Sequence, residues 1–296
     1  MGSLKRAIVA IGLAVAVAVL WSGGVMPSLF GQTNTTYPAG FKAPRLPGGN
    51  APDLNGFWQA VNTANWDIEE HGTAPSPFPA LEGAYFAQPA GFGVVEGGPL
   101  PYKPEALARR NKYRQMRLTP DPLLLENGRT DGSDPEAKCY GGGVPRGAYL
   151  GLPFQIIQTP NKVLLAYEYA GAARTVHLDM QRAQLLDIES WNGTSVGKWE
   201  GDSLVTDVQW FNNEVWLDRS GNHYGRGAKV AERFTPMSPY HMQYEATIDD
   251  PNNFTRPWKL SMPLYRRMEP QMELHEFQCI PYGEEYHYKN LVKKTK

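Results

Sequence analysis

Residues 190–234 read SWNGTSVGKWEGDSLVTDVQWFNNEVWLDRSGNHYGRGAKVAERF, and this stretch decides the fold. Two strand-like runs flank the pair Gly201-Asp202, since the first run ends at Trp199 and the second begins at Ser203. A glycine followed by an aspartate suits a two-residue turn that needs positive φ angles, and such turns join antiparallel neighbours. The stretch therefore predicts a β-hairpin.

Short strand-like runs continue on both sides of this hairpin. They are rich in β-branched and aromatic residues, and turn-forming residues separate them at intervals of about ten to fifteen positions. This spacing favours a meandering antiparallel sheet. The predicted strands are 154–158, 162–169, 174–178, 204–210, 229–234, 242–248, 258–262 and 272–279.

The alternation within one of these runs indicates how the sheet is used. Met242, Tyr244, Ala246 and Ile248 alternate with polar residues, so this strand has one dry face and one wet face. About eight strands without helical crossovers predict a mainly β protein, either a closed barrel or a sandwich. We favour an antiparallel barrel of lipocalin-like type.

The N-terminal half has a different composition. The chain contains 25 prolines and 30 glycines, and prolines recur every few residues between 71 and 104, which forbids long helices and central strands. A short apolar strand begins near Phe57, and one short helix is predicted from Pro104 to about Met116. The predicted organisation is a signal peptide (1–24), a flexible lead-in (25–52) and a single β-rich domain (53–296), with an irregular wrap plus helix in 53–146 and the sheet in 147–290.

The first residues have the pattern of a secretory signal. Lys5 and Arg6 precede an apolar run from Ala7 to Trp21. The run is about fifteen residues long, shorter than the roughly twenty that a spanning helix needs. We predict a periplasmic or secreted protein without stable membrane insertion after signal removal, and an uncleaved anchor is the alternative.

The charge balance excludes some partners. The formal net charge is −1, and removal of Lys5 and Arg6 with the signal changes it to −3. Nucleic-acid binding needs a basic surplus, which is absent. We therefore expect a small-molecule ligand as partner, and no nucleic acid.

The chain has two cysteines, Cys139 and Cys279. In an exported protein the simplest interpretation of such a pair is a disulfide. Two buried thiols are the alternative.

Several motifs carry a resemblance to a known family. They are GFW at 56–58, NTANW at 62–66, GVPR at 143–146, SVGKWEGD at 195–202, ERF at 232–234 and TIDDP at 247–251. On these motifs, which are spread over most of the chain, the protein resembles a family of uncharacterised exported bacterial proteins. The resemblance implies an exported β-rich domain and no particular reaction.

His177 and Asp179 are the candidates for chemistry. They are two positions apart on a predicted strand, so they project from the same face, where Asp179 would orient His177 as a general base. With His223, the pair forms our predicted catalytic set. The same three residues are the right types for a non-haem metal site. A solvated hydrogen-bonded pair is a further interpretation of His177 and Asp179.

Four residues are candidates for ligand binding. Arg146 has the bidentate donors that a ligand carboxylate needs, and a structural salt bridge is its alternative role. Glu232 is expected to point inward from its strand. Trp191 and Trp210 are expected to line a cavity or to belong to the core.

These observations predict an exported protein that handles a small, partly apolar molecule in a barrel or sandwich cavity. His/Asp acid-base chemistry of hydrolase, lyase or isomerase type is one version, and plain ligand binding is the other. A metal enzyme and an envelope-interaction protein are further alternatives. Our primary interpretation includes no cofactor and no metal.

Overall fold

The computed structural model describes residues 41–75, 84, 87–118, 134–277 and 279. The predicted signal peptide and the first part of the predicted lead-in lie outside the described residues.

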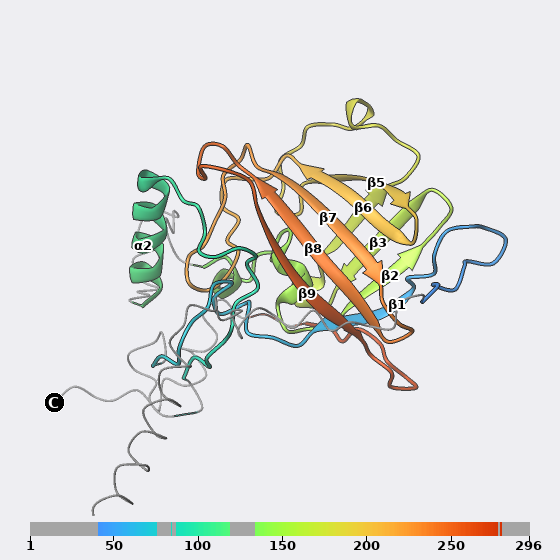
Figure 1. Ribbon diagram of the computed structural model, residues 1–296, viewed down its shortest axis with the longest axis horizontal. Coiled ribbons are helices and arrows are strands. Elements are labelled where there is room, and N and C mark those ends of the chain that lie inside the picture. Colours follow the sequence, from blue (N-terminus) through green and yellow to red (C-terminus); the bar gives the residue numbers. More distant parts are fainter. Residues whose placement is uncertain (1–40, 76–83, 85–86, 119–133, 278, 280–296) are drawn as a thin grey trace, which may run out of the picture. The chain divides into compact units, whose positions relative to one another are not determined.

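Nine strands close into a barrel, in which strands that follow one another along the chain are neighbours and β1 pairs with β9 (Figure 1). The strands are β1 (Gly56–Ala60), β2 (Phe154–Gln158), β3 (Lys162–Tyr167), β4 (Ala173–His177), β5 (Thr194–Glu200), β6 (Ser203–Gln209), β7 (Lys229–Pro236), β8 (His241–Asp249) and β9 (Trp258–Arg266). The mainly β prediction and the barrel are confirmed.

The decisive hairpin forms as its sequence predicts. Strands β5 and β6 pair antiparallel from Thr194 opposite Gln209 to Glu200 opposite Ser203, which leaves a two-residue turn. Gly201 in this turn has a φ of 60°, a left-handed conformation that glycine adopts without strain.

The predicted strand over 272–279 is wrong, because its described residues carry no strand. The free edge of β9 that such a strand would need is occupied by β1, with Trp58 opposite Arg266 and Ala60 opposite Leu264. The C-terminal segment is held instead by side chains: the Phe277 ring packs against that of Tyr169, with centroids 4.9 Å apart.

One neighbouring pair departs from the predicted antiparallel meander. Strands β4 and β5 run parallel, with Val176 opposite Ser195 and His177 opposite Val196. The chain between them, residues 178–193, contains the short helix η5 (Arg182–Gln184) and returns to the end of the barrel from which β4 began.

Alternate residues of the strands point into the barrel and form its core. The dry face predicted for β8 is confirmed, since Met242, Tyr244, Ala246 and Ile248 are fully buried. Other large strand side chains of this core include Trp58, Phe154, Ile156, Leu165, Tyr167, Leu204, Phe234, Trp258, Leu260, Met262 and Leu264.

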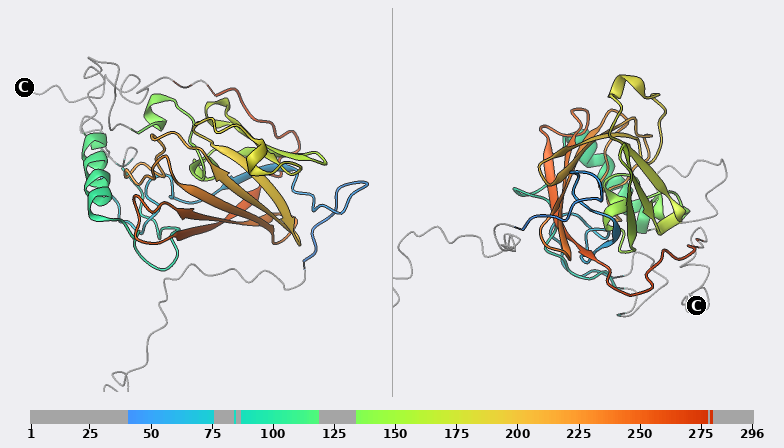
Figure 2. Two further views of the ribbon diagram at one scale, coloured as in Figure 1. Left: turned by 90° about the horizontal axis from the view of Figure 1, so that it is seen from above. Right: turned by 90° about the vertical axis from the view of Figure 1, so that its right-hand side faces the viewer.

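Helix α2 (Pro104–Leu118) lies at one end of the barrel (Figures 1 and 2). Its Tyr113 stacks on Trp216 with ring centroids 4.9 Å apart. A Cβ at Gly221 would lie 2.9 Å from the Cβ of Tyr113 and 3.0 Å from the carbonyl oxygen of Arg110, so glycine permits this close approach. Among the described residues, no helix is long and apolar enough to cross a membrane.

Three further short helices support the ends of the barrel. They are η2 (Glu136–Lys138), η3 (Arg146–Tyr149) and η4 (Tyr169–Gly171). The single α-helix of the described residues agrees with the prediction of one helix beginning at Pro104.

Candidate functional site

The predicted base His177 lies on the outer face of the barrel. Side chains alternate along β4, and Arg174 and Val176 are the buried ones, so His177 projects to the other side. Its Nδ1 has no hydrogen-bond partner among the described residues, and Asp179 accepts instead from Asn161 Nδ2 at 3.0 Å. The two side chains therefore do not form the hydrogen-bonded pair that their spacing suggests.

His223 lies in a different environment, in the connection between β6 and β7, where it forms an isolated antiparallel bridge with Trp216 and contacts α2. The His223 ring contacts Tyr113 and Tyr102, with centroids 4.9 and 5.9 Å away. Burial lowers the pKa of His223 to about 4, so its imidazole is neutral at pH 7. Its Nδ1 lies 3.1 Å from the carbonyl oxygen of Gly221.

The metal alternative fails on geometry. The part of the chain that the structure describes contains no group of three His, Cys, Asp or Glu side chains placed to hold a metal ion. His177, Asp179 and His223 are all described, and they do not assemble into a metal-binding triad.

Arg146 belongs to a buried ion-pair network. Its Nη1 and Nη2 donate to the two oxygens of Asp134 at 2.7 and 2.9 Å, and its Nη2 also donates to Glu136 at 2.7 Å. Its Nε donates to Asn65. These contacts are those of the structural salt bridge, and they occupy the donors that a ligand carboxylate would need.

Glu136 joins this network to Arg219. Burial would raise the pKa of Glu136, but the charges of Arg219 and Arg146 outweigh burial and lower the pKa to about 2. Arg219 donates from Nε and Nη2 to the two Glu136 oxygens at 2.8 and 2.7 Å. The carboxylate is thus held ionised.

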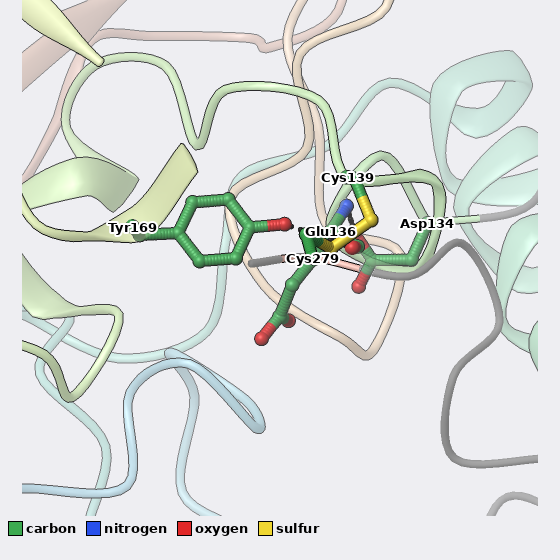
Figure 3. Close-up of a disulfide and its surroundings, with 5 residues drawn as sticks. All are labelled: Asp134, Glu136, Cys139, Tyr169 and Cys279. Atoms are coloured by element: carbon green, nitrogen blue, oxygen red, sulfur yellow. Dashed lines mark hydrogen bonds between the residues drawn. A yellow bond between two sulfur atoms is a disulfide. The ribbon is translucent and has the colours of Figure 1, made fainter. Parts of the chain in front are cut away.

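The predicted disulfide lies beside this network. Cys139 and Cys279 are bonded, with Cα atoms 5.6 Å apart. Figure 3 shows the bond next to Tyr169, whose hydroxyl donates to the backbone carbonyl of Glu136 at 2.8 Å. The network and the disulfide together fix the chain that precedes β2.

The two predicted ligand-lining tryptophans lie outside the strands. Trp191 packs against the edge of the core and against Tyr140, with ring centroids 5.3 Å apart. Trp210 has a φ of 63°, and the guanidinium of Arg182 lies 5.1 Å from the centroid of its indole ring. Both tryptophans thus contact other side chains of the protein.

Glu232 points into the barrel, as predicted, and it forms an ion pair there with Arg174. Arg174 Nη1 donates to Glu232 Oε2 at 2.5 Å and Nη2 to Oε1 at 3.2 Å. Both side chains are only 2% exposed. Burial alone would lower the pKa of Arg174, but the charge of Glu232 outweighs burial and raises it.

Two hydroxyl groups complete the partners of Glu232. Thr206 Oγ1 donates to Oε2 at 2.7 Å, and the Tyr244 hydroxyl donates to Oε1 at 2.8 Å. Removal of a charge from water is costly, and the hydrogen bonds to both oxygens of Glu232 offset this cost for its buried carboxylate. We call Arg174, Thr206, Glu232 and Tyr244 the interior cluster.

Seven buried side-chain polar atoms of the described residues have no hydrogen-bond partner, and three of them, Arg174 Nε, Ser195 Oγ and Trp258 Nε1, belong to inward-facing strand residues. Arg174 and Ser195 lie on the inner faces of neighbouring strands, β4 and β5. Nearly all buried polar groups in proteins are bonded to protein, water or ligand, so Arg174 Nε and Ser195 Oγ mark a candidate binding position.

An open hollow on the barrel is a weaker candidate. Its volume is about 380 Å³, and its lining includes Glu96, Thr247, Arg256 and Lys259. Lys259 is already paired with Glu96 and with Glu245, at 2.9 and 2.8 Å. The charges of this hollow thus largely cancel.

Sequence reasoning found Glu232 and missed its partner Arg174. The available signal was the alternation Arg174, Val176, Leu178 on one face of the strand, in which an arginine shares the side of two apolar residues. Comparison of the chain with family models, with curated proteins and with solved structures finds no match. The family resemblance of the sequence therefore stays a prediction.

Proposed function

We propose that the barrel binds one small, partly apolar molecule beside the interior cluster, without catalysing a reaction on it. The observation that carries the proposal is the pair of buried, unpartnered groups, Arg174 Nε and Ser195 Oγ. A bound molecule that accepts their hydrogen bonds removes the cost of burying them unpaired.

The geometry favours binding over acid-base catalysis by His177. The His177 side chain is on the outer face of β4, whereas the interior cluster lies on the inner faces of β4, β6, β7 and β8. A general base must come within hydrogen-bond reach of the proton that it takes. For a ligand inside the barrel, His177 does not meet this requirement.

The proposed setting is the periplasm or the outside of the cell. The disulfide between Cys139 and Cys279 supports this, because such bonds persist in oxidising compartments.

An ordered water is the rival occupant, because water also satisfies buried donors. Native mass spectrometry of the protein purified after export from a bacterial host separates the two. We expect a fraction heavier than the polypeptide by the mass of one small molecule, which organic extraction then releases. If the protein carries only its own mass, and no compound of a small-molecule library raises its melting temperature, the proposal is wrong and water is the occupant.

A pair of matched variants locates the site. Ser195→Val replaces the unpartnered hydroxyl by a methyl group and adds a second methyl group, so it is expected to abolish the bound mass. His177→Ala, on the neighbouring strand but the opposite face, is expected to retain it. Retention by Ser195→Val would place the molecule elsewhere and contradict the interior site.

A further inference from the structure

We infer that the molecule bound in the barrel is electrically neutral and carries an oxygen acceptor, such as a ketone, an ester or an ether, rather than a carboxylate or phosphate. This inference rests on the proposed function and specifies its ligand. It follows from three properties of the interior: its charge balance, the chemistry of its unpartnered groups and the size of the surrounding side chains.

The charge balance excludes an anion. Among the strand residues that the structure describes, Arg174 and Glu232 are the only buried ionised side chains, and they neutralise each other. The Thr206 and Tyr244 hydroxyl groups already donate their hydrogen bonds to Glu232. A carboxylate ligand would enter with no opposite charge left to compensate its removal from water.

The unpartnered groups select an acceptor. A serine hydroxyl both donates and accepts, whereas the Nε of an arginine is a donor only, so the arginine is the group that requires an acceptor atom. Arg174 and Ser195 are both buried, and Ser195 is fully so. A carbonyl or ether oxygen accepts from such donors without bringing charge, whereas a hydrocarbon would leave them unsatisfied.

The neighbouring side chains select a small apolar body. Ser195 lies in a row of paired residues that continues to Ile248 on β8 and Trp258 on β9, and its nearest members are four valines. They are Val163, Val176, Val208 and Val230, all fully buried. Val176 and Val208, the direct neighbours of Ser195 in this row, offer short apolar side chains on both sides of it, which suits a short alkyl chain or a small ring.

Hexan-2-one and hexanoate test the inference, because they share six carbon atoms and differ in charge. Affinities for the intact, disulfide-bonded protein are measured by titration at about pH 8, where hexanoate is ionised. We expect the ketone to bind at least about tenfold more tightly. The ketone accepts a charge-assisted hydrogen bond from Arg174, whereas hexanoate brings a charge that no group in the interior compensates.

Glu232→Gln should reverse this order. The glutamine keeps the size of Glu232 and accepts from Thr206 or Tyr244, but it no longer neutralises Arg174. The variant is therefore expected to prefer hexanoate by at least about tenfold. Arg233→Gln, one position along β7 on the outer face, is the control and should leave the preference for the ketone unchanged.

If the Glu232→Gln variant does not fold, a second measurement on the wild-type protein tests the same inference. In the wild-type protein, the affinity of the acid is compared with that of hexan-2-one at each pH. This ratio should be higher at about pH 4, where much of the acid is neutral hexanoic acid, than at about pH 8, where it is hexanoate. A wild-type preference for hexanoate at pH 8 overturns the inference and leaves the proposed function intact. Failure of every ketone from butan-2-one to octan-2-one to bind overturns this inference, whereas the proposed function fails only if the protein also carries no bound mass and no library compound raises its melting temperature.

Discussion

Asp67 and Asp218 accept hydrogen bonds from the same group, the side-chain amide of Asn222, at 3.2 and 2.7 Å. Both carboxyl groups are buried at the end of the barrel that α2 covers. Burial and the charge of Asp67 raise the pKa of Asp218 to about 7. The pair therefore binds a proton near neutral pH.

This carboxyl pair predicts a loss of stability as the pH rises. Between pH 3.8 and about 7 the folded state holds a proton on Asp218 that the unfolded state has released, so this group favours folding less as pH increases. The change amounts to about 4 kcal/mol at most, from about three pKa units. Asp67→Asn removes the repulsion and should flatten the decline in a series of urea unfolding curves. Arg110, 3.7 Å from Asp67, and Arg146 are the cations that moderate it.

Glu136 predicts the opposite slope at lower pH. Its folded-state pKa of about 2 lies below the ordinary 4.5, so its stabilisation is complete above pH 4.5 and is lost as the pH falls toward 2. Glu136→Gln should cost about 3 kcal/mol at pH 7 and little at pH 2. An equal cost at both values would mean that the Glu136 charge does not stabilise the fold.

His223 contributes in the same direction over a neighbouring range. Its pKa of about 4 is below the ordinary 6.5, so the folded state resists protonation and loses stability as the pH falls from 6.5 toward 4. The pH dependence of stability contributed by His223 is opposite in sign to that contributed by Asp218. Each contribution is obtained by comparing the free energy of unfolding of the wild type with that of the variant, His223→Gln or Asp67→Asn, at each pH. His223→Gln, which cannot gain the charge, should lose the acid sensitivity in this range.

Arg174→Met should destabilise the barrel by about 3 to 5 kcal/mol, because it leaves the Glu232 carboxylate buried without its counter-charge. Chemical denaturation at neutral pH measures this change. Arg233→Met is the matched surface variant, since Arg233 pairs with Glu200 in solvent, and it should cost less than about 1 kcal/mol. In Arg174→Met/Glu232→Leu much of the loss should be recovered. If the double variant is as unstable as the sum of the single ones, the two charges are not coupled.

Removal of the disulfide should lower the free energy of unfolding by about 5 kcal/mol. The bond joins residues 140 positions apart, and the chain-entropy model assigns this value to a loop of that length. The Cys139→Ala/Cys279→Ala protein, compared with the wild type with and without a reductant, measures the effect. A wild type that is equally stable in the reductant, with its thiols shown to be reduced, would contradict it.

The hairpin and the dry face of β8 were predictable because both are local. A Gly-Asp turn between two strand-like runs specifies its own pairing, and the alternation from Met242 to Ile248 reports burial directly. The position of β1 was not predictable in this way. Its partners, Phe154 to Ile156 on one side and Leu264 to Arg266 on the other, are distant in the sequence, and no local pattern encodes that closure.

The candidate site was half predictable for a similar reason. Alternation along β4 defines two faces, one with Arg174 and Val176 and one with Thr175 and His177, but it does not say which is inside. Placing the arginine outside is the natural choice, and it puts His177 in the interior. The buried glutamate three strands away reverses that choice, because Arg174 gains from Glu232 what it loses in leaving water.

The parallel pairing of β4 and β5 has a consequence for the topology as a whole. Around a closed circuit, strand direction can alternate at every step only if the number of strands is even, and this circuit has nine. An odd circuit always retains a like-directed pair. Replacing residues 178–193 by a tight turn would reverse β5 to β9 and move that pair to the seam between β9 and β1. The long connection thus determines that the parallel pair is β4 and β5, whereas the odd number of strands makes one such pair unavoidable.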